Sequence, residues 1–300
     1  MSAAAPLVTV LVPAYNAAPY LRVAMESVLA QDFRDFELLI VDDGSTDDTH
    51  AVLSRVTDPR VRVVRQENTG LVGALNNGLA LARGEFVARM DADDLMAPGR
   101  LSAQLAMMVA DDRLVSCGTD YVLFGDATGR VRMPRTDRAC RQRLLLASCH
   151  CGASVMVRRS VLDRSGLQFR PEFAHAEDYR FFSELSEHGT MSNVPMVGYH
   201  YRIYGSQVSS VHRTAQRDAH LRIAREHALR TGAGPLSDHL LERMLWPVSP
   251  PTSSASAIAA HVAATARPAV AAVLRRPGFE TVRFSGRKIV EALAAVRASR

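Results

Sequence analysis

The sequence predicts an α/β fold in which a mostly parallel sheet is flanked by helices, with a helical C-terminal extension. Apolar, β-branched runs alternate with segments whose apolar residues recur at helical spacing, and the connections between them are short. Several of the apolar runs also end in polar turns. Such alternation places the strands parallel, and ligands of open α/β sheets bind beyond the carboxyl ends of the strands.

The first expected strand, residues 8–13, is an apolar run closed by proline, as in strands buried on both faces. Residues 19–31 have one apolar face and predict a helix. Residues 36–41 predict a second buried strand, and Thr46 is the expected cap of a helix that ends near residue 56.

Residues 61–65 alternate as a third strand, and residues 69–83 predict a third helix that stops at Gly84. Residues 85–90 form the fourth expected strand. The third helix has an expected apolar side of Leu71, Leu75, Leu79 and Ala82. Farther along, the expected helices are residues 98–110, 137–147, 160–164, 176–188 and 214–230, and the expected strands are residues 115–124, 153–157 and 196–204.

Composition divides the chain into a domain of residues 1–212 and a basic, mainly helical extension of residues 213–300. The net charge of +5 is uneven, because residues 1–212 hold 22 Arg/Lys and 25 Asp/Glu, whereas residues 213–300 hold 14 and 6. The extension is therefore expected either to contact an anionic membrane surface or to form a helical cap or a dimerisation arm. We expect no nucleic-acid partner.

The whole chain is 47% hydrophobic and 22% charged, as in globular proteins with a substantial core. We find no secretory signal at the start and no apolar run of about 18 residues. Four cysteines are too few for a disulfide scaffold at this length, so we expect a cytoplasmic protein with reduced thiols. For Cys149-His150-Cys151, a reduced loop is a better interpretation than a zinc site, which needs four ligands.

Three polar turns follow expected parallel strands, at residues 13–16, 42–45 and 91–94, and should meet at one edge of the sheet. The third contains Asp91, Asp93 and Asp94. Clustered carboxylates raise each other's pKa, so their grouping favours a site for a divalent cation such as Mn²⁺ or Mg²⁺. In isolation, such a stretch is more often a solvated turn.

Residues 41–49 (VDDGSTDDT) and 84–94 (GEFVARMDADD), together with the first strand and turn, resemble the family 2 inverting glycosyltransferases, which have a Rossmann-like GT-A fold. The resemblance covers roughly residues 7–210. It implies transfer of a sugar from a nucleotide-sugar, with a UDP- or dTDP-sugar favoured, to a hydroxyl acceptor. The donor-binding residues that it implies are Pro13, Tyr15, Asn16, Asp42, Asp43, Arg89, Asp91 and Ala92.

The resemblance also assigns the metal to Asp93 with Asp91, and His200 is a further candidate ligand. Asp94 is expected just outside the metal ligands. Arg89 would contact the sugar or diphosphate, or would simply pair with the acids.

A fourth motif, residues 176–179 (AEDY), resembles the acidic pair that opens the acceptor-side helix of the family, which makes Asp178 the expected general base. Inversion by one in-line displacement needs such a carboxylate to take the proton of the acceptor hydroxyl. Glu177 and Arg202 are expected on the acceptor side. Without the resemblance, Glu177 and Asp178 are an ordinary acidic first turn, favoured by the helix dipole.

The chain departs from the family pattern at Leu75, where the family often has Arg, and at Tyr204, where it has His. It also lacks the Gln-x-x-Arg-Trp motif of processive synthases, so we expect one or a few sugars to be added to a saccharide, a lipid-linked saccharide or a small molecule. A homodimer is compatible with the sequence. The alternatives are a non-catalytic sugar-nucleotide binder and a sugar nucleotidyltransferase, but residues 13–16 lack the glycine-rich basic loop that a triphosphate requires.

Overall fold

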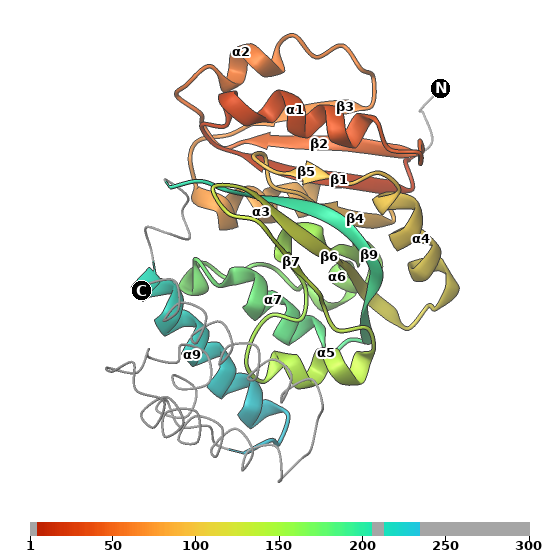
Figure 1. The fold of residues 1–300 in the computed structure, drawn as a ribbon, viewed down its shortest axis with the longest axis vertical. Helices are drawn as coiled ribbons and strands as arrows, with labels where there is room; N and C mark the ends of the chain where they lie inside the picture. Colours follow the sequence, from red (N-terminus) through yellow and green to blue (C-terminus); the bar gives the residue numbers. More distant parts are fainter. Residues whose placement is uncertain (1–4, 206–212, 235–300) are drawn as a thin grey trace.

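The computed structural model describes residues 5–205 and 213–234. Within them, nine strands form one sheet in the order β3-β2-β1-β4-β8-β6-β9-β5, with β7 paired to β6 (Figure 1). The strands are β1 (Val8–Ala14), β2 (Phe36–Asp42), β3 (Val61–Arg65), β4 (Phe86–Arg89), β5 (Leu95–Met96), β6 (Leu114–Gly125), β7 (Gly129–Val131), β8 (Met156–Arg158) and β9 (Thr190–Ile203). The helices are α1 (Ala18–Leu29), α2 (Thr49–Leu53), α3 (Gly70–Leu81), α4 (Arg100–Ala110), α5 (Asp137–Leu144), α6 (Arg159–Ser165), α7 (Glu177–Leu185) and α9 (Arg213–Arg230), with 3₁₀ turns at Gly152–Ser154 and Pro171–Phe173.

The predicted α/β class is confirmed, and the sheet is mixed rather than parallel throughout. Strands β3, β2, β1 and β4 are parallel, as the alternation of strands and helices predicts. Beyond β4, strands β8 and β6 pair antiparallel, and β9 is parallel to β6. The parallel half therefore carries the polar turns at one edge, and the antiparallel half extends the sheet away from it.

Side chains of the parallel strands alternate between two cores, one on each face of the sheet. Leu11 and Leu39 pack in the core beneath α3 and α7, whereas Val10 and Leu38 pack in the core beneath α1 and α4. This period-two pattern explains why the strand sequences are apolar almost without interruption.

Two local predictions in the first half are wrong. Thr46 does not cap a helix, because its backbone N–H donates to Asn16 Oδ1 at 2.8 Å and α2 begins only at Thr49. Leu71 is 42% exposed, since it lies in the first turn of α3 and the helix turns Val72 and Leu75 toward the sheet.

Two short strands, β5 and β7, were not predicted, and β9 begins six residues earlier than expected. Strand β5 has only two residues, Leu95 and Met96, which pair with β9 directly after the acidic stretch. Its length is too small for a periodicity to appear in the sequence. Strand β9 extends back to Thr190 because its first half pairs with the buried half of β6.

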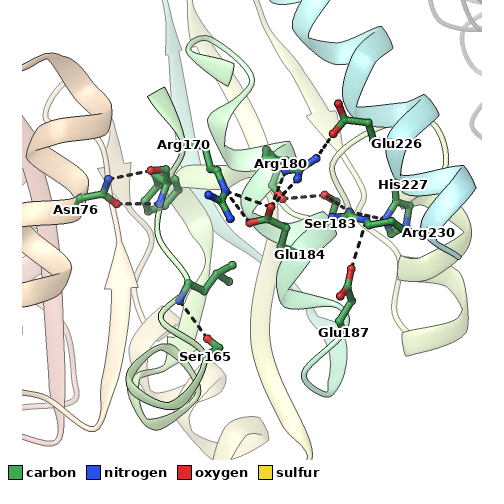
Figure 2. Close-up of polar contacts among 12 residues, drawn as sticks. Asn76, Ser165, Arg170, Arg180, Ser183, Glu184, Glu187, Glu226, His227 and Arg230 are labelled. Carbon is green, nitrogen blue, oxygen red and sulfur yellow. Dashed lines mark hydrogen bonds and ion pairs between the residues drawn. The ribbon is translucent and has the colours of Figure 1, made fainter. Parts of the chain in front are cut away.

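Helix α9, the first part of the basic extension, packs on α7. Its apolar residues Leu221, Ile223 and Ala224 belong to the same core as the strands. Figure 2 shows the polar contacts around this packing: Arg180 pairs with Glu226, and Arg230 lies 3.4 Å from Glu187. This arrangement agrees with the helical-cap interpretation for residues 213–230. Residues 235–300 lie outside the described residues, so the division at residue 212 and any membrane contact of the later part stay predictions.

The loop after α6 is fastened to α3 by Asn76. Its side-chain amide donates to Phe169 O at 2.9 Å, and its Oδ1 accepts from Phe169 N at 2.8 Å (Figure 2). In the part of the chain that the structure describes, we find no helix with the length and apolar character needed to cross a bilayer.

Candidate active site

The first two polar turns meet at the edge of the sheet, as predicted. Ala14 and Asp42 are register partners at the ends of β1 and β2, and Asp43 N donates to Ala14 O at 2.8 Å. Asn16 N donates to Ser45 Oγ at 3.0 Å, which joins the turns a second time. The two turns therefore form one continuous ledge.

Exposed and buried groups are separated along this ledge. Tyr15 is 50% exposed, and its ring is available for stacking, whereas Pro13 is buried within β1. Asn16 has a positive φ of 50°, a conformation that asparagine tolerates better than most residues. The turn thus presents Tyr15 outward from a fixed backbone.

Asp42 and Asp43 are both buried, but their carboxylates have different hydrogen-bond partners. Asp42 Oδ1 accepts from Ser45 N at 3.0 Å and shapes the turn, while its Oδ2 lies 3.6 Å from Arg65 Nε. Asp43 Oδ1 accepts from Gln66 Nε2 at 2.7 Å and from Thr69 N at 2.9 Å. These contacts all use Oδ1 of Asp43, so they fix the carboxylate without engaging Oδ2.

The position directly after these two acids, residue 44, requires a glycine. Its φ is +73°, and a Cβ there would lie 2.9 Å from the backbone N of Asn68. A side chain at this position would therefore be strained both by backbone conformation and by space.

The acidic stretch follows β4 at the same edge, and β9 holds it from the other side. Tyr199 Oη donates to Asp94 Oδ2 at 2.7 Å, and Arg202 N donates to Asp94 Oδ1 at 2.6 Å. Arg202 Nε donates to Asp93 O at 2.7 Å, and Tyr204 Oη donates to Asp93 Oδ2 at 2.8 Å. Groups at the C-terminal end of β9 and directly after it thus hold both acids in place by hydrogen bonds.

Burial and mutual repulsion perturb these carboxyl groups. Desolvation and the charges of Asp91 and Asp93 raise the pKa of Asp94 to about 8. Desolvation and the charge of Asp91 also raise the pKa of Asp93. The partly buried Asp93 and the buried Asp94, both with raised pKa values, have a deficit of positive charge around them, which a bound cation would offset.

Arg89 connects the acidic stretch to the expected base. It is buried, and its Nη2 lies 2.9 Å from Asp91 Oδ1. Burial alone would lower its pKa, but the charges of Asp91, Glu177 and Asp178 raise it. The ion pair of Arg89 with Asp91 is therefore present in the structure. Contact of Arg89 with the sugar or diphosphate stays a prediction.

Glu177 and Asp178 open α7, as predicted. Burial and the charge of Asp178 raise the pKa of Glu177 to about 7. Burial also raises the pKa of Asp178, against the opposing effect of Arg89, and Asp178 Oδ1 accepts from Tyr179 N at 2.7 Å. A carboxyl group with a raised pKa is suited to accept a proton near neutral pH.

The space between Arg89 and Asp178 is kept open by Gly152. A Cβ on Gly152 would lie 2.6 Å from Arg89 Nη1 and 2.7 Å from Asp178 Oδ2. Those two atoms are therefore within about 5.3 Å of each other. The acids after β4 and the carboxylate of α7 thus border a single site.

A cavity of about 740 Å³ opens beside Asp178. His175, two residues before Glu177, also lines it and has a positive φ of 72°, which is uncommon outside glycine and is often found at functional sites. Gln216 of α9 donates to His175 O at 3.0 Å. The first helix of the extension therefore supports the backbone that leads into the expected base.

The structure also contains residues that sequence reasoning missed. Arg100 is fully buried behind the site, donates from Nη2 to Arg89 O at 2.7 Å, and lies 5.4 Å from the ring of Tyr199. Burial lowers the pKa of Arg100 to about 10. An isolated Arg at the start of a helix gave no signal of this role. Tyr199 belongs to a tyrosine-rich run, which was the only hint of its role, whereas Tyr204 had been noted at the position where the family has His.

Two histidines have structural contacts. His200 makes an edge contact with Phe124, with ring centroids 6.3 Å apart, so its role as a metal ligand stays a prediction. His150 is buried, with its Nε2 2.9 Å from Ser116 Oγ and its Nδ1 2.9 Å from Asn193 Oδ1. Within residues 5–205 and 213–234, no cluster of three or more His, Cys, Asp or Glu side chains could hold a metal by itself.

Comparison with known proteins relates this site to a family. Residues 9–166 match the family model described as glycosyl transferase family 2. An uncharacterized glycosyltransferase of Haemophilus influenzae is 30% identical over 237 residues, which cover 74% of this chain and 73% of that protein. The Escherichia coli UDP-Glc:alpha-D-GlcNAc-diphosphoundecaprenol beta-1,3-glucosyltransferase WfgD is 30% identical over 209 residues, which cover 68% of this chain and 80% of that protein.

Solved structures share the fold. S. aureus TarS 1–349 superposes with a TM-score of 0.63 at 17% identity, covering 98% of this chain and 92% of that chain. The mannosyltransferase PcManGT from Pyrobaculum calidifontis, in complex with GDP-Man and Mn²⁺, superposes with a TM-score of 0.59 at 22% identity. The match covers 97% of this chain and 87% of that chain.

Proposed function

The chain belongs to glycosyl transferase family 2 and is a glycosyltransferase that uses a nucleotide-sugar donor, and we propose that it works by an inverting, metal-dependent mechanism. The observation that carries this proposal is the position of Arg89, which pairs with Asp91 and lies within about 5.3 Å of Asp178. The buried guanidinium group of Arg89 therefore lies close both to an acid proposed for the donor side, Asp91, and to the proposed acceptor-side base, Asp178.

The donor would lie along the ledge formed by the first two turns. Tyr15 would stack on the base, and Asp43 would accept a hydrogen bond from a base N–H through Oδ2. A uracil or thymine offers such an N–H, so a UDP- or dTDP-sugar is the favoured donor. S. aureus TarS has been solved with UDP and with UDP-GlcNAc, which supports this preference, whereas PcManGT was solved with GDP-Man. The remaining proposed donor contacts are Pro13, Asn16, Asp42, Arg89, Asp91 and Ala92.

Asp93 and Asp91 fit a hard divalent cation, Mn²⁺ or Mg²⁺. Such ions are often held by one or two carboxylates together with substrate phosphate oxygens, so a protein cluster of three ligands is not required. The raised pKa values of Asp93 and of the buried Asp94 support a cation here. When bound, the metal would offset the negative charge that develops on the departing diphosphate.

Asp178 would act as the general base. Its carboxylate would take the proton of the acceptor hydroxyl as that oxygen attacks the anomeric carbon and the bond to the nucleoside diphosphate breaks. Attack from the face opposite the leaving group inverts the configuration. Glu177 and Arg89 would set the charge around Asp178, and Arg202 would hold the acidic stretch through Asp93 and Asp94.

The acceptor is proposed to belong to the synthesis of a cell-surface polysaccharide, glycolipid or other glycoconjugate. Relatives include chondroitin synthase of Escherichia coli, of which this chain covers 33%, and the WfgD glucosyltransferase. We propose a cytoplasmic location with peripheral contact to the inner membrane face through residues 213–300, and a homodimer remains compatible. Flotation of the full chain with vesicles of anionic or of neutral lipid tests the membrane contact, and equal recovery with both would contradict it.

Two substitutions test the catalytic assignment. Asp93→Ala should abolish metal-dependent UDP binding and donor turnover. Asp178→Asn should leave UDP binding unchanged and lower sugar transfer by about 10²–10⁴-fold, the usual size of a general-base effect. Asp112→Asn, at an exposed position away from the site, is the matched control. Full activity of Asp93→Ala would refute the proposal, and donor binding without transfer by the wild type would favour a non-catalytic binder.

A further inference from the structure

Two side-chain amides link helix α3 to Asp43, the acid that is proposed to contact the donor base. Asn77 of α3 donates from Nδ2 to Gln66 Oε1 at 2.5 Å. Gln66, the residue after β3, donates from Nε2 to Asp43 Oδ1 at 2.7 Å. The backbone of Gln66 is fixed as well, because its N–H donates to Asp42 O at 2.9 Å. A helix outside the ledge is therefore connected to the ledge through one amide.

The orientation of the Gln66 amide follows from the chemistry of its partners. An ionised carboxylate can only accept hydrogen bonds, so Gln66 must turn its NH₂ group toward Asp43. The same NH₂ group donates to Thr69 Oγ1 at 2.7 Å. The amide oxygen of Gln66 then faces α3, where Asn77 supplies the N–H that it needs. Asn77 is thus the residue that keeps the Gln66 amide from turning over.

The result at Asp43 is a carboxylate with one anchored oxygen and one accessible oxygen. Gln66 Nε2, Thr69 N and Thr69 Oγ1 lie 2.7, 2.9 and 3.2 Å from Oδ1. The residue as a whole is only 3% exposed. Its Oδ2 accepts no hydrogen bond from the described residues, and it is not one of the buried side-chain atoms that lack a partner. Oδ2 therefore reaches the surface of the ledge in a fixed direction.

We propose that Asn77 and Gln66 are positioning residues that set the choice of donor base, because they hold Asp43 Oδ2 as an acceptor for a base N–H. This inference rests on the proposed function, since it takes the ledge as the site of the donor base. Uracil and thymine carry a hydrogen on N3, whereas cytosine has a lone pair there. A fixed carboxylate oxygen binds the first two and repels the third, and a carboxylate that can rotate discriminates less.

The test compares UDP with CDP, which differ only at positions 3 and 4 of the base, by calorimetry on the full chain with Mn²⁺. The wild type should bind UDP at least about tenfold more tightly than CDP, the size expected for a hydrogen bond to a charged group. Asn77→Asp keeps the size of the side chain but cannot donate. Either orientation of the Gln66 amide then leaves its oxygen against a carboxylate, so UDP binding should fall about tenfold relative to CDP binding.

Gln66→Met removes one donor to Asp43 Oδ1 but leaves Thr69 N in place. The loss of UDP binding relative to CDP should therefore be about threefold, smaller than for Asn77→Asp although residue 66 is the one that contacts Asp43. A general structural fault, or the charge that Asn77→Asp adds, would weaken both nucleotides alike and leave their ratio unchanged. Gln168→Met, at an exposed position in the loop after α6, is the matched control and should keep the wild-type ratio.

A ratio of UDP to CDP affinity that Asn77→Asp leaves unchanged would overturn the inference. Equal binding of UDP and CDP by the wild type would overturn it as well, and this result does not depend on how well any variant folds. Absence of Mn²⁺-dependent UDP binding by the wild type would instead refute the proposed function, so the two failures are distinguishable.

Discussion

Glu177→Gln offers a test of the electrostatics of the site that does not require a known substrate. Burial and the charge of Asp178 raise the pKa of Glu177 from 4.5 to about 7. The glutamine keeps the shape of the side chain and removes its charge. The variant therefore isolates the free energy that is needed to hold this second carboxylate ionised beside Asp178.

The sign of the effect follows from proton binding. Because the folded-state pKa is the higher one, the folded protein binds more protons than the unfolded chain between pH 4.5 and about 7, and its stability falls as the pH rises through that window. Above pH 7 the full cost is present, and a pKa change of this size corresponds to about 3 kcal/mol. Glu177→Gln should therefore be stabilising by up to about 3 kcal/mol at pH 8 and close to neutral at pH 4.5.

Urea unfolding followed by circular dichroism at pH 5 and pH 8 measures this difference. Comparing variant with wild type at each pH cancels the contributions of titrating groups that do not interact with Glu177, so the difference reports on Glu177 together with its neighbour Asp178. Glu172→Gln, at an exposed position in the preceding 3₁₀ turn, should change the free energy of unfolding by less than about 0.5 kcal/mol at either pH. A Glu177→Gln variant that is less stable at pH 8, or that shows the same difference at both pH values, would refute the reasoning.

Three further outcomes are expected. Gly152→Ala should lower kcat by about 10²-fold and change UDP affinity little, because its Cβ would displace the groups of Arg89 and Asp178; unchanged kcat would contradict the spacing described here. Tyr204→Phe should tighten Mn²⁺ binding about tenfold in calorimetry, since the ion would no longer compete with the hydroxyl for Asp93 Oδ2. Weaker Mn²⁺ binding would contradict this and would mean that the hydroxyl helps to hold Asp93 for the metal. Chelation with EDTA should abolish transfer and Mn²⁺ should restore it, whereas full activity in EDTA would rule out the metal-dependent mechanism.

The parallel half of the fold could be predicted because its signals are local. The strands around Val10 and Leu38 are apolar on both faces, and strand direction then places their polar turns at one edge without further information. That is how Asp43 and Asp91 could be assigned to the same site. Thr46 was misassigned because its partner, Asn16, lies 30 residues away and satisfies its N–H before any helix begins.

The contacts that complete the site could not be predicted in the same way. Tyr199 bonds to Asp94 across 105 residues of sequence, and nothing in either neighbourhood indicates the other. Helix α9 shows no clear apolar side in its sequence because its buried apolar residues, Leu221, Ile223, Ala224 and Ala228, are few among many charged ones. Its packing on α7 depends on the shape of the partner helix, which a single sequence does not reveal.

The packing of α9 has a practical consequence for shortening the chain. Truncation at residue 212 would follow the change in composition, but it would uncover the apolar surface of α7 and leave Arg180 and Glu187 without their partners on α9. It would also remove Gln216, which donates to the backbone O of His175, three residues before the proposed base Asp178. The shortest fragment expected to keep α7 packed as it is here therefore ends beyond residue 230.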